Sequence, residues 1–182
     1  MEAVGYDLYC KMLNQAVSAL KGERQAGASY ETAVECDIDA YIPSSYIKNE
    51  YQKLDIYKRI SAIETEDEYM DMQDELMDRF GDIPGSVDNL LKIAKLRALA
   101  HRAFATEVLV NRQEVRFTMY RGAELDAAGI PEIIKRYKGD LKLVPGETPV
   151  FHYLDRRHRN TDSLPMMEIA EELAKDLLEL RI

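Results

Sequence analysis

The stretch DELMDRFGDIP, residues 74–84, contains the end of a predicted helix, and three of the last seven helical residues, Asp74, Glu75 and Asp78, are acidic. Upstream, Thr65-x-x-Glu68 has the spacing of a capping box, which predicts a helix that starts there. Gly81 is the expected stop, because glycine commonly ends a helix. The sequence therefore predicts one helix from Thr65 to Phe80, with charged residues that are nearly all negative.

At about 100° per residue, this predicted helix has two distinct sides. Its apolar side carries Tyr69, Met72, Leu76 and Phe80. The opposite side carries Asp67, Asp71, Asp74, Glu75 and Asp78. Solvated helices usually mix charge signs, so this acidic stripe has two interpretations. It either keeps the protein in solution, or it binds a basic partner.

The excess negative charge lies in one segment of the chain. The sequence has 182 residues, 46% hydrophobic and 31% charged, with a net charge of −9. Residues 31–80 contain 14 acids and 5 bases, whereas the remainder has 19 of each. Such a segment repels nucleic acid backbones and attracts basic surfaces. No apolar run approaches the roughly 18 residues of a membrane span. The two cysteines, Cys10 and Cys36, lie on apolar faces of different predicted elements, where reduced core thiols are expected, so we expect a cytoplasmic protein.

The remaining periodicities predict an α+β fold, with a small mixed or antiparallel sheet flanked by several helices. Expected helices cover residues 5–21, 47–63, 84–104, 131–138 and 164–181, and expected strands cover 30–40, the hairpin 107–119, 141–144 and 149–154. A polar, glycine-bearing linker follows the first helix. We therefore predict an extension helix in residues 1–22, a linker in 23–30 and one domain in 31–182.

No catalytic motif is recognisable in the sequence. It contains no P-loop, no G-x-G-x-x-G and no G-x-S-x-G. His101 lies in the middle of a predicted helix in an apolar setting, which favours a core or boundary histidine over a catalytic one. His152 and His158 have no third ligand at a metal-binding spacing. The acidic stripe lacks the interleaved glycine of calcium loops. We therefore expect no metal and no cofactor, although an enzyme with an unrecognised site is an alternative.

One dense basic patch, RRHR at residues 156–159, offers a different hypothesis. Arg156, Arg157 and Arg159 could contact an anion, or the loop could simply be solvated. An independent nucleic-acid-binding module using this loop is therefore a second alternative. The net negative charge and the lack of interleaved aromatic residues argue against it.

Several segments resemble one family. GYDLYCKMLNQAV, ECDIDAYIPSSYI, YKRISAIETEDEY, ELMDRFGDIP and LLKIAKLRALAHR are similar, in order and approximate spacing, to the C-terminal part of the bacterial transcription-repair coupling factor (Mfd) family. The resemblance covers residues 4–104 well. YKRI and ELMDRFGDIP are its most specific parts.

The resemblance implies an autoinhibitory, non-catalytic domain. In the family this domain packs on a UvrB-like module, masks the surface that recruits UvrA, and restrains the DNA translocase until RNA polymerase is engaged. Acidic residues of the ELxDRFG helix meet arginines of that module, which corresponds here to Glu75 and Asp78, with Asp71 one turn earlier. Residues 1–22 resemble a helix that hooks around the motor domain. The whole family protein would use ATP and Mg²⁺.

We predict that this chain has no ATPase activity, because it lacks a loop that cradles phosphates. The measurement is phosphate release by the purified protein against a mock purification. Turnover above the mock that is abolished by a point substitution within the chain would contradict the prediction.

Overall fold

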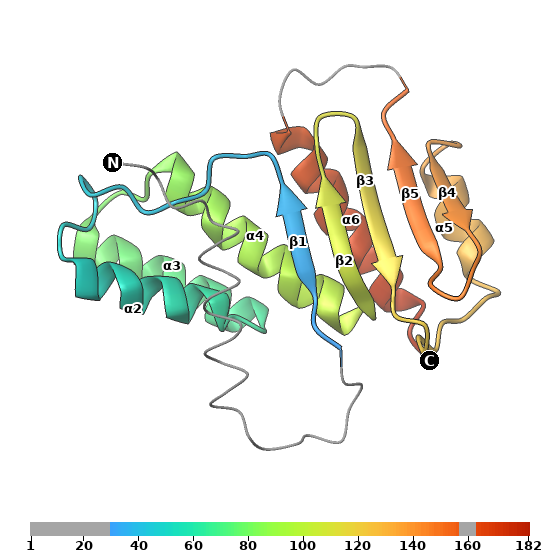
Figure 1. The fold of residues 1–182 in the computed structure, drawn as a ribbon, viewed down its shortest axis with the longest axis horizontal. Coiled ribbons are helices and arrows are strands. Elements are labelled where there is room, and N and C mark those ends of the chain that lie inside the picture. The colour runs from blue at the N-terminus through green and yellow to red at the C-terminus, as the bar shows by residue number, and fades with distance from the viewer. Residues whose placement is uncertain (1–29, 157–162) are drawn as a thin grey trace. The chain divides into compact units, whose positions relative to one another are not determined.

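The computed structural model describes residues 30–156 and 163–182, in which five helices and five strands form an α+β fold (Figure 1). This confirms the predicted fold class. The described residues divide into two compact units, one of residues 39–95 and one of residues 30–38 with 96–182. The predicted extension helix and most of the linker lie outside the described residues.

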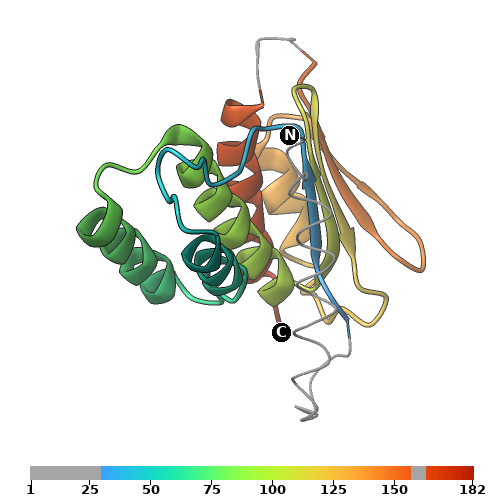
Figure 2. The same ribbon diagram turned by 60° about the vertical axis from the view of Figure 1, so that its left-hand side comes forward.

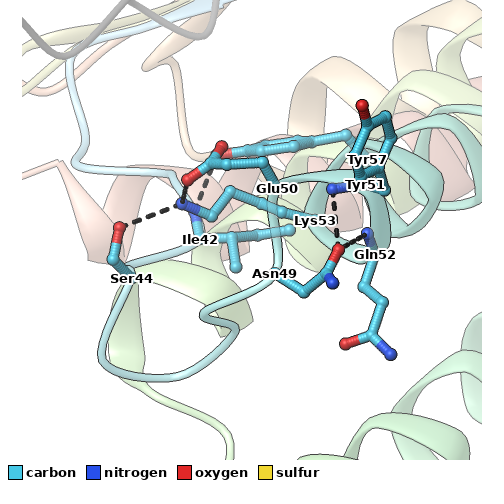
Figure 3. A network of polar contacts seen from close by, with 8 residues as sticks. All are labelled: Ile42, Ser44, Asn49, Glu50, Tyr51, Gln52, Lys53 and Tyr57. Atoms are coloured by element: carbon cyan, nitrogen blue, oxygen red, sulfur yellow. Dashed lines mark hydrogen bonds and ion pairs between the residues drawn. The ribbon is translucent and has the colours of Figure 1, made fainter.

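The first unit contains α2 (Glu50–Ser61), α3 (Glu66–Phe80) and the first part of α4 (Gly85–Arg102). The start of α2 is fixed by Asn49, whose side-chain oxygen accepts hydrogen bonds from the backbone N–H groups of Tyr51 and Gln52, at 2.9 and 3.1 Å (Figure 3). These bonds satisfy donors that a helix start leaves without partners. The helix predicted for residues 47–63 is confirmed with a later start.

The capping box predicted for α3 is present. Thr65 Oγ1 accepts from the N–H of Glu68 at 3.2 Å, and Glu68 Oε2 accepts from the N–H of Thr65 at 3.1 Å. At the other end, Gly81 has a φ of 83°, and its N–H donates to the carbonyl of Met77 at 3.0 Å. A residue with a Cβ would be strained at that φ. Both ends of α3 are therefore set by local sequence.

The apolar side of α3 faces the interior of the unit. Met72 and Leu76 are buried, whereas Tyr69 and Phe80 at the two ends of the stripe are half-buried. The Phe80 ring lies 5.7 Å from the ring of Tyr46, between centroids. Burial of the central pair fixes the rotation of α3, so its opposite side faces solvent.

The second unit is built on a sheet with strand order β1-β2-β3-β5-β4. Its strands are β1 (Ala33–Cys36), β2 (Ala105–Val110), β3 (Glu114–Met119), β4 (Leu141–Val144) and β5 (Val150–Leu154). β1 pairs with β2 in parallel, and all other pairs are antiparallel. The prediction of a mixed sheet is confirmed.

The first strand is shorter than predicted. Alternation of apolar and acidic residues extends over residues 30–40, but only the four residues of β1 pair with β2, from Ala33 opposite Glu107 to Cys36 opposite Val110. An alternating pattern indicates that successive side chains point to a buried face and to an exposed face of the sheet. It does not report how many backbone groups find a partner strand, and β1 is an edge strand with a single neighbour.

In the second unit α5 (Ile130–Arg136), α6 (Leu164–Glu179) and the last part of α4 lie against the same face of the sheet (Figures 1 and 2). The facing strand residues Val115, Phe117, Phe151 and Leu141 are fully or almost fully buried. On α6, the buried residues are Met166, Met167, Ala170, Leu173, Ala174 and Leu177. The helices predicted for 131–138 and 164–181 are confirmed within two residues at each end.

Substituting Thr65 tests whether the cap fixes α3. Thr65→Ala should lower the free energy of unfolding by about 1 kcal/mol, because the N–H of Glu68 loses its acceptor. Urea titrations followed by circular dichroism measure this change, with Thr65→Ser as the control that keeps the hydroxyl. Equal stability of the alanine and serine variants would contradict a capping role.

Candidate functional site

Four aspartates form a row along the exposed side of α3. They are Asp67, Asp71, Asp74 and Asp78, and we call them the acidic row. Spacings of four, three and four residues place their side chains on one helical face. Neighbouring members are about 5–6 Å apart at Cβ, and each like-charged i, i+4 pair costs a few tenths of a kcal/mol. The acidic row therefore carries an electrostatic cost within the helix.

No cation within the described part of the chain neutralises the acidic row. None of its four carboxylates has an ion pair or a hydrogen bond to another described side chain. Neighbouring acids of α3 differ in this respect, since Glu66 Oε1 lies 2.8 Å from Lys95 Nζ of α4. The acidic row is thus the part of α3 whose negative charge remains exposed to solvent.

Glu75 belongs to the predicted acidic stripe, but in the structure its carboxylate is paired with two arginines. Its Oε1 accepts from Arg59 Nη1 of α2 at 2.5 Å and from Arg79 Nη1 at 2.6 Å, and its Oε2 accepts from the second terminal nitrogen of Arg59. The side chain is only 28% exposed. Glu75 lies at the edge of the helix nearest α2, and both of its oxygens are already bound.

These arginines change the protonation of Glu75. Hydrogen bonds from Arg59 first, and then from Arg79, lower the pKa of the Glu75 carboxyl from 4.5 to about 2. Each bond favours the charged form of the carboxylate. The Glu75 hydrogen bond likewise raises the pKa of Arg59 above its usual value. At neutral pH Glu75 consequently links α2 to α3 as a charged carboxylate.

Met77 is apolar but lies on the exposed part of α3. Met77 is 54% exposed, and Met70, seven residues earlier, is 48% exposed. Two exposed methionines therefore flank the acidic row on the same helix. Helical spacing alone indicates this arrangement, because residues 70 and 77 are two turns apart.

A shallow pocket lies beside the acidic row, between the end of α2 and the start of α3. It has a volume of about 310 Å³ and is lined by Arg59, Ala62, Ile63, Glu68, Asp71 and Met72. Sequence reasoning did not find it, because its two sides come from different helices. Of the three residues predicted for partner binding, Asp71 lines the pocket, Asp78 lies on the acidic row and Glu75 is paired.

The remaining candidate residues are the arginines of the basic patch and the histidines. Arg156 is exposed in a turn, and residues 157 and 159, the other two arginines of the basic patch, fall outside the described residues. His101 Nδ1 lies 3.0 Å from Thr32 Oγ1, and His152 Nε2 lies 2.7 Å from Glu114 Oε2. Anion binding by the patch stays a prediction. Among the residues described, no three His, Cys, Asp or Glu side chains are grouped to hold a metal ion.

Together these features define an α+β fold whose candidate site is the charged, exposed face of α3. A sequence model described as the TRCF domain matches residues 36–130, more than half of the chain. The chain therefore belongs to the TRCF domain family.

Similar proteins agree with this assignment. The chain is 34% identical over 139 residues to the transcription-repair-coupling factor of Bacillus subtilis (strain 168), covering 75% of this chain and 12% of that protein. It is 41% identical over 101 residues to the factor of Staphylococcus aureus (strain NCTC 8325 / PS 47), covering 55% of this chain and 9% of that protein. The chain thus spans about a tenth of the length of these relatives.

A solved structure shows the same fold. The crystal structure of the C-terminal domain of a transcription-repair coupling factor superposes with a TM-score of 0.64 at 22% identity, covering 84% of this chain and 94% of that one. Over the part of the chain described here, no helix is long and apolar enough to cross a membrane.

The pKa of Glu75 predicts a pH-dependent contribution to stability. Its folded pKa of about 2 lies below the usual 4.5, so the stabilisation is fully present above pH 4.5 and is lost as pH falls towards 2. Glu75→Gln should therefore cost up to about 1 kcal/mol at pH 7, and the difference from wild type should shrink below pH 4.5. Urea titrations between pH 2 and 7 measure it.

The control for Glu75→Gln is Asp74→Asn, which removes a neighbouring carboxylate that has no cation partner among the described residues. Asp74→Asn should change stability by less than about 0.5 kcal/mol. A Glu75→Gln cost that does not change between pH 7 and pH 2.5 would show that the ion pairs do not stabilise the fold.

Proposed function

We propose that this chain is a non-catalytic protein-interaction domain that docks on a basic surface through the acidic row of α3. The observation that carries the proposal is a set of carboxylates that have no cation partner among the described residues, at regular spacing on a helix that is fixed at both ends. The capping box at Thr65 and the stop at Gly81 set the ends of α3. Burial of Met72 and Leu76 sets its rotation.

Such a face suits arginine side chains on the partner. The planar guanidinium can bind a carboxylate through two parallel hydrogen bonds, which fixes orientation as well as adding energy. An exposed pair contributes at most about 1 kcal/mol. Several pairs on one rigid face therefore give an interaction that is specific in geometry yet readily released.

The partner that we propose is the UvrB-like module of a transcription-repair-coupling factor. Membership of the TRCF domain family and the similarity to such factors support this proposal. Docking would cover the surface that recruits UvrA and would restrain the DNA translocase until RNA polymerase is engaged. A few kcal/mol is enough to move such an equilibrium from mostly closed to mostly open, which matches the strength of a small number of exposed ion pairs.

The roles of the three predicted contact residues differ in this proposal. Asp78 and Asp71 are exposed and have no described ion-pair partner, so they are available for arginines of the module. Glu75 is bound on both oxygens by Arg59 and Arg79. We assign Glu75 to the alignment of α2 with α3, with Asp74 taking its place in the docking face.

The proposal requires no cofactor for this chain and no direct contact with nucleic acid or membrane. The net charge of −9 opposes binding to a phosphate backbone. ATP and Mg²⁺ would serve the motor of the longer protein. A protein with these partners would act in the cytoplasm.

Removing two carboxylates of the acidic row tests the proposed docking. Asp74→Asn with Asp78→Asn should weaken binding of this chain to a separately purified UvrB-like module by roughly 3- to 30-fold, because two exposed ion pairs are lost. Calorimetric titration measures the affinity. Stability should stay within about 0.5 kcal/mol of wild type, and added salt should weaken the wild-type complex more than the variant complex.

The matched control is Glu35→Gln with Glu107→Gln, which removes the same charge from exposed positions on the sheet. This pair should bind the module like wild type. Equal affinities of the aspartate variant and wild type would mean that the acidic row is only a solvated face.

A further inference from the structure

We propose that the uncovered face of the sheet is a second docking surface, which binds a peptide segment of alternating acidic and apolar residues from a partner protein. The helices α5, α6 and the last part of α4 lie against one face of the sheet, and the opposite face is turned towards the viewer in Figure 1. We call this opposite side the open face. It lies entirely within the second unit, so the inference does not depend on the docking of α3.

Three basic side chains form a row across the open face, on three adjacent strands. Arg116 of β3 is paired with His152 of β5, and His152 is paired in turn with Lys142 of β4. We call these three residues the basic row. Neighbouring strands are about 4.8 Å apart, so β3 and β4 are separated by roughly 10 Å. The residues that flank the row along the strands include four that are buried on the covered face: Val115, Phe117, Leu141 and Phe151.

The two outer cations of the basic row are available to a partner. Neither Arg116 nor Lys142 makes an ion pair or a side-chain hydrogen bond with another described residue. The one carboxylate beside the row is Glu114, which is bound at both oxygens. Its Oε2 lies 2.7 Å from His152 Nε2, and its Oε1 accepts from Asn111 Nδ2 at 3.4 Å.

Glu114 therefore orients the histidine instead of neutralising the row. A carboxylate can only accept a hydrogen bond, so the contact requires a proton on His152 Nε2. This contact keeps the imidazole ring between Arg116 and Lys142. Over β3, β5 and β4 the open face thus carries two cations on either side of a histidine whose hydrogen bond to a carboxylate is already made.

Exposed apolar side chains lie beside the basic row. Val144 is 51% exposed and Leu154 is 38% exposed. Val144 is paired with Val150 on one side of the row, and Leu154 is paired with Glu114 on the other. Covering such side chains favours association with a partner. Cations with apolar neighbours on both sides match a segment in which carboxylates alternate with apolar side chains.

The same face is poorly suited to a nucleic acid. The aromatic residues of the described strands are Phe117, Phe151 and Tyr153, and their register places all three on the covered face. Bases would therefore find no ring to stack on. At the other end of the sheet the open face carries Glu35 and Glu107, which repel a phosphate backbone. A short acidic segment of a protein can bind over β3, β5 and β4 without reaching them.

The direct test is a titration of the full chain with a short peptide of alternating glutamate and leucine. Methyl NMR signals of Val144, Val150 and Leu154 are followed, and saturable shifts are expected. The comparison probes are the matching lysine–leucine peptide and oligothymidylate, neither of which should give saturable shifts. Absence of saturation with the glutamate peptide, or equal or stronger binding of oligothymidylate, would overturn the proposal.

Neutralising the outer cations tests the role of the row. Arg116→Gln with Lys142→Gln should weaken binding of the glutamate peptide by roughly 3- to 30-fold, as for the loss of two exposed ion pairs. The matched control, Arg121→Gln with Lys135→Gln, removes the same charge from exposed positions in the same unit and should bind like wild type. Equal affinities of the row variant and wild type would overturn the proposal. Circular dichroism checks that each variant is folded.

Reversing the charge separates direct contact from an effect on the fold. A folded Arg116→Glu with Lys142→Glu variant should lose the glutamate peptide and gain binding to the lysine–leucine peptide. A folded variant without that gain would show that the two cations do not contact the peptide. Asp74→Asn with Asp78→Asn should bind the glutamate peptide like wild type, because the open face contains no residue of α3. Failure of this inference therefore leaves the docking of α3 untouched, and the reverse also holds.

Discussion

The hydrogen-bonded ion pair between Glu75 and Arg59 determines which carboxylates of α3 remain available to bind a partner. Without the contacts of Glu75 with Arg59 and Arg79, the acidic stripe of α3 would consist of five carboxylates with no ion pair to a described residue. With these contacts, Glu75 connects α3 to α2, and the hydrogen bonds lower the pKa of its carboxyl to about 2. The two arginines of the region are used in the same contact. The four carboxylates of the acidic row, by contrast, have no ion pair to any residue that the structure describes.

The local features of the fold are the ones that the sequence predicts well. The capping box of α3 depends on two residues three positions apart, and the hairpin of β2 and β3 depends on a short turn between alternating segments. Each signal is complete within a few residues, because the interacting groups are neighbours in the chain. The same holds for the exposed side of α3, which follows from helical periodicity once Met72 and Leu76 are placed inside.

Features that depend on distant segments could not be predicted in this way. Arg59 and Glu75 are 16 residues apart, and no periodicity links a residue of α2 to a particular carboxylate of α3. The length of β1 is another example, since its partner β2 lies about 70 residues later and limits the pairing to four positions. The pocket requires both helices at once. For the candidate site, the sequence therefore predicts that the acidic side of α3 is exposed, but it cannot say which of the acids are already bound within the protein.

The acids of α3 differ in whether their charge stabilises or destabilises the helix, and this difference helps to separate structural from functional residues. Glu66, Asp67 and Glu68 lie in the first turn, where negative charge interacts favourably with the helix dipole. Asp78 lies in the last turn, where the same interaction is unfavourable. Asp74 and Asp78 also repel each other at i, i+4 spacing. Neither gains an ion pair among the described residues in return. Positions that break a local rule without an internal compensation are expected at functional sites. This physical cost therefore indicates the same face of α3 as do its carboxylates that have no cation partner among the described residues.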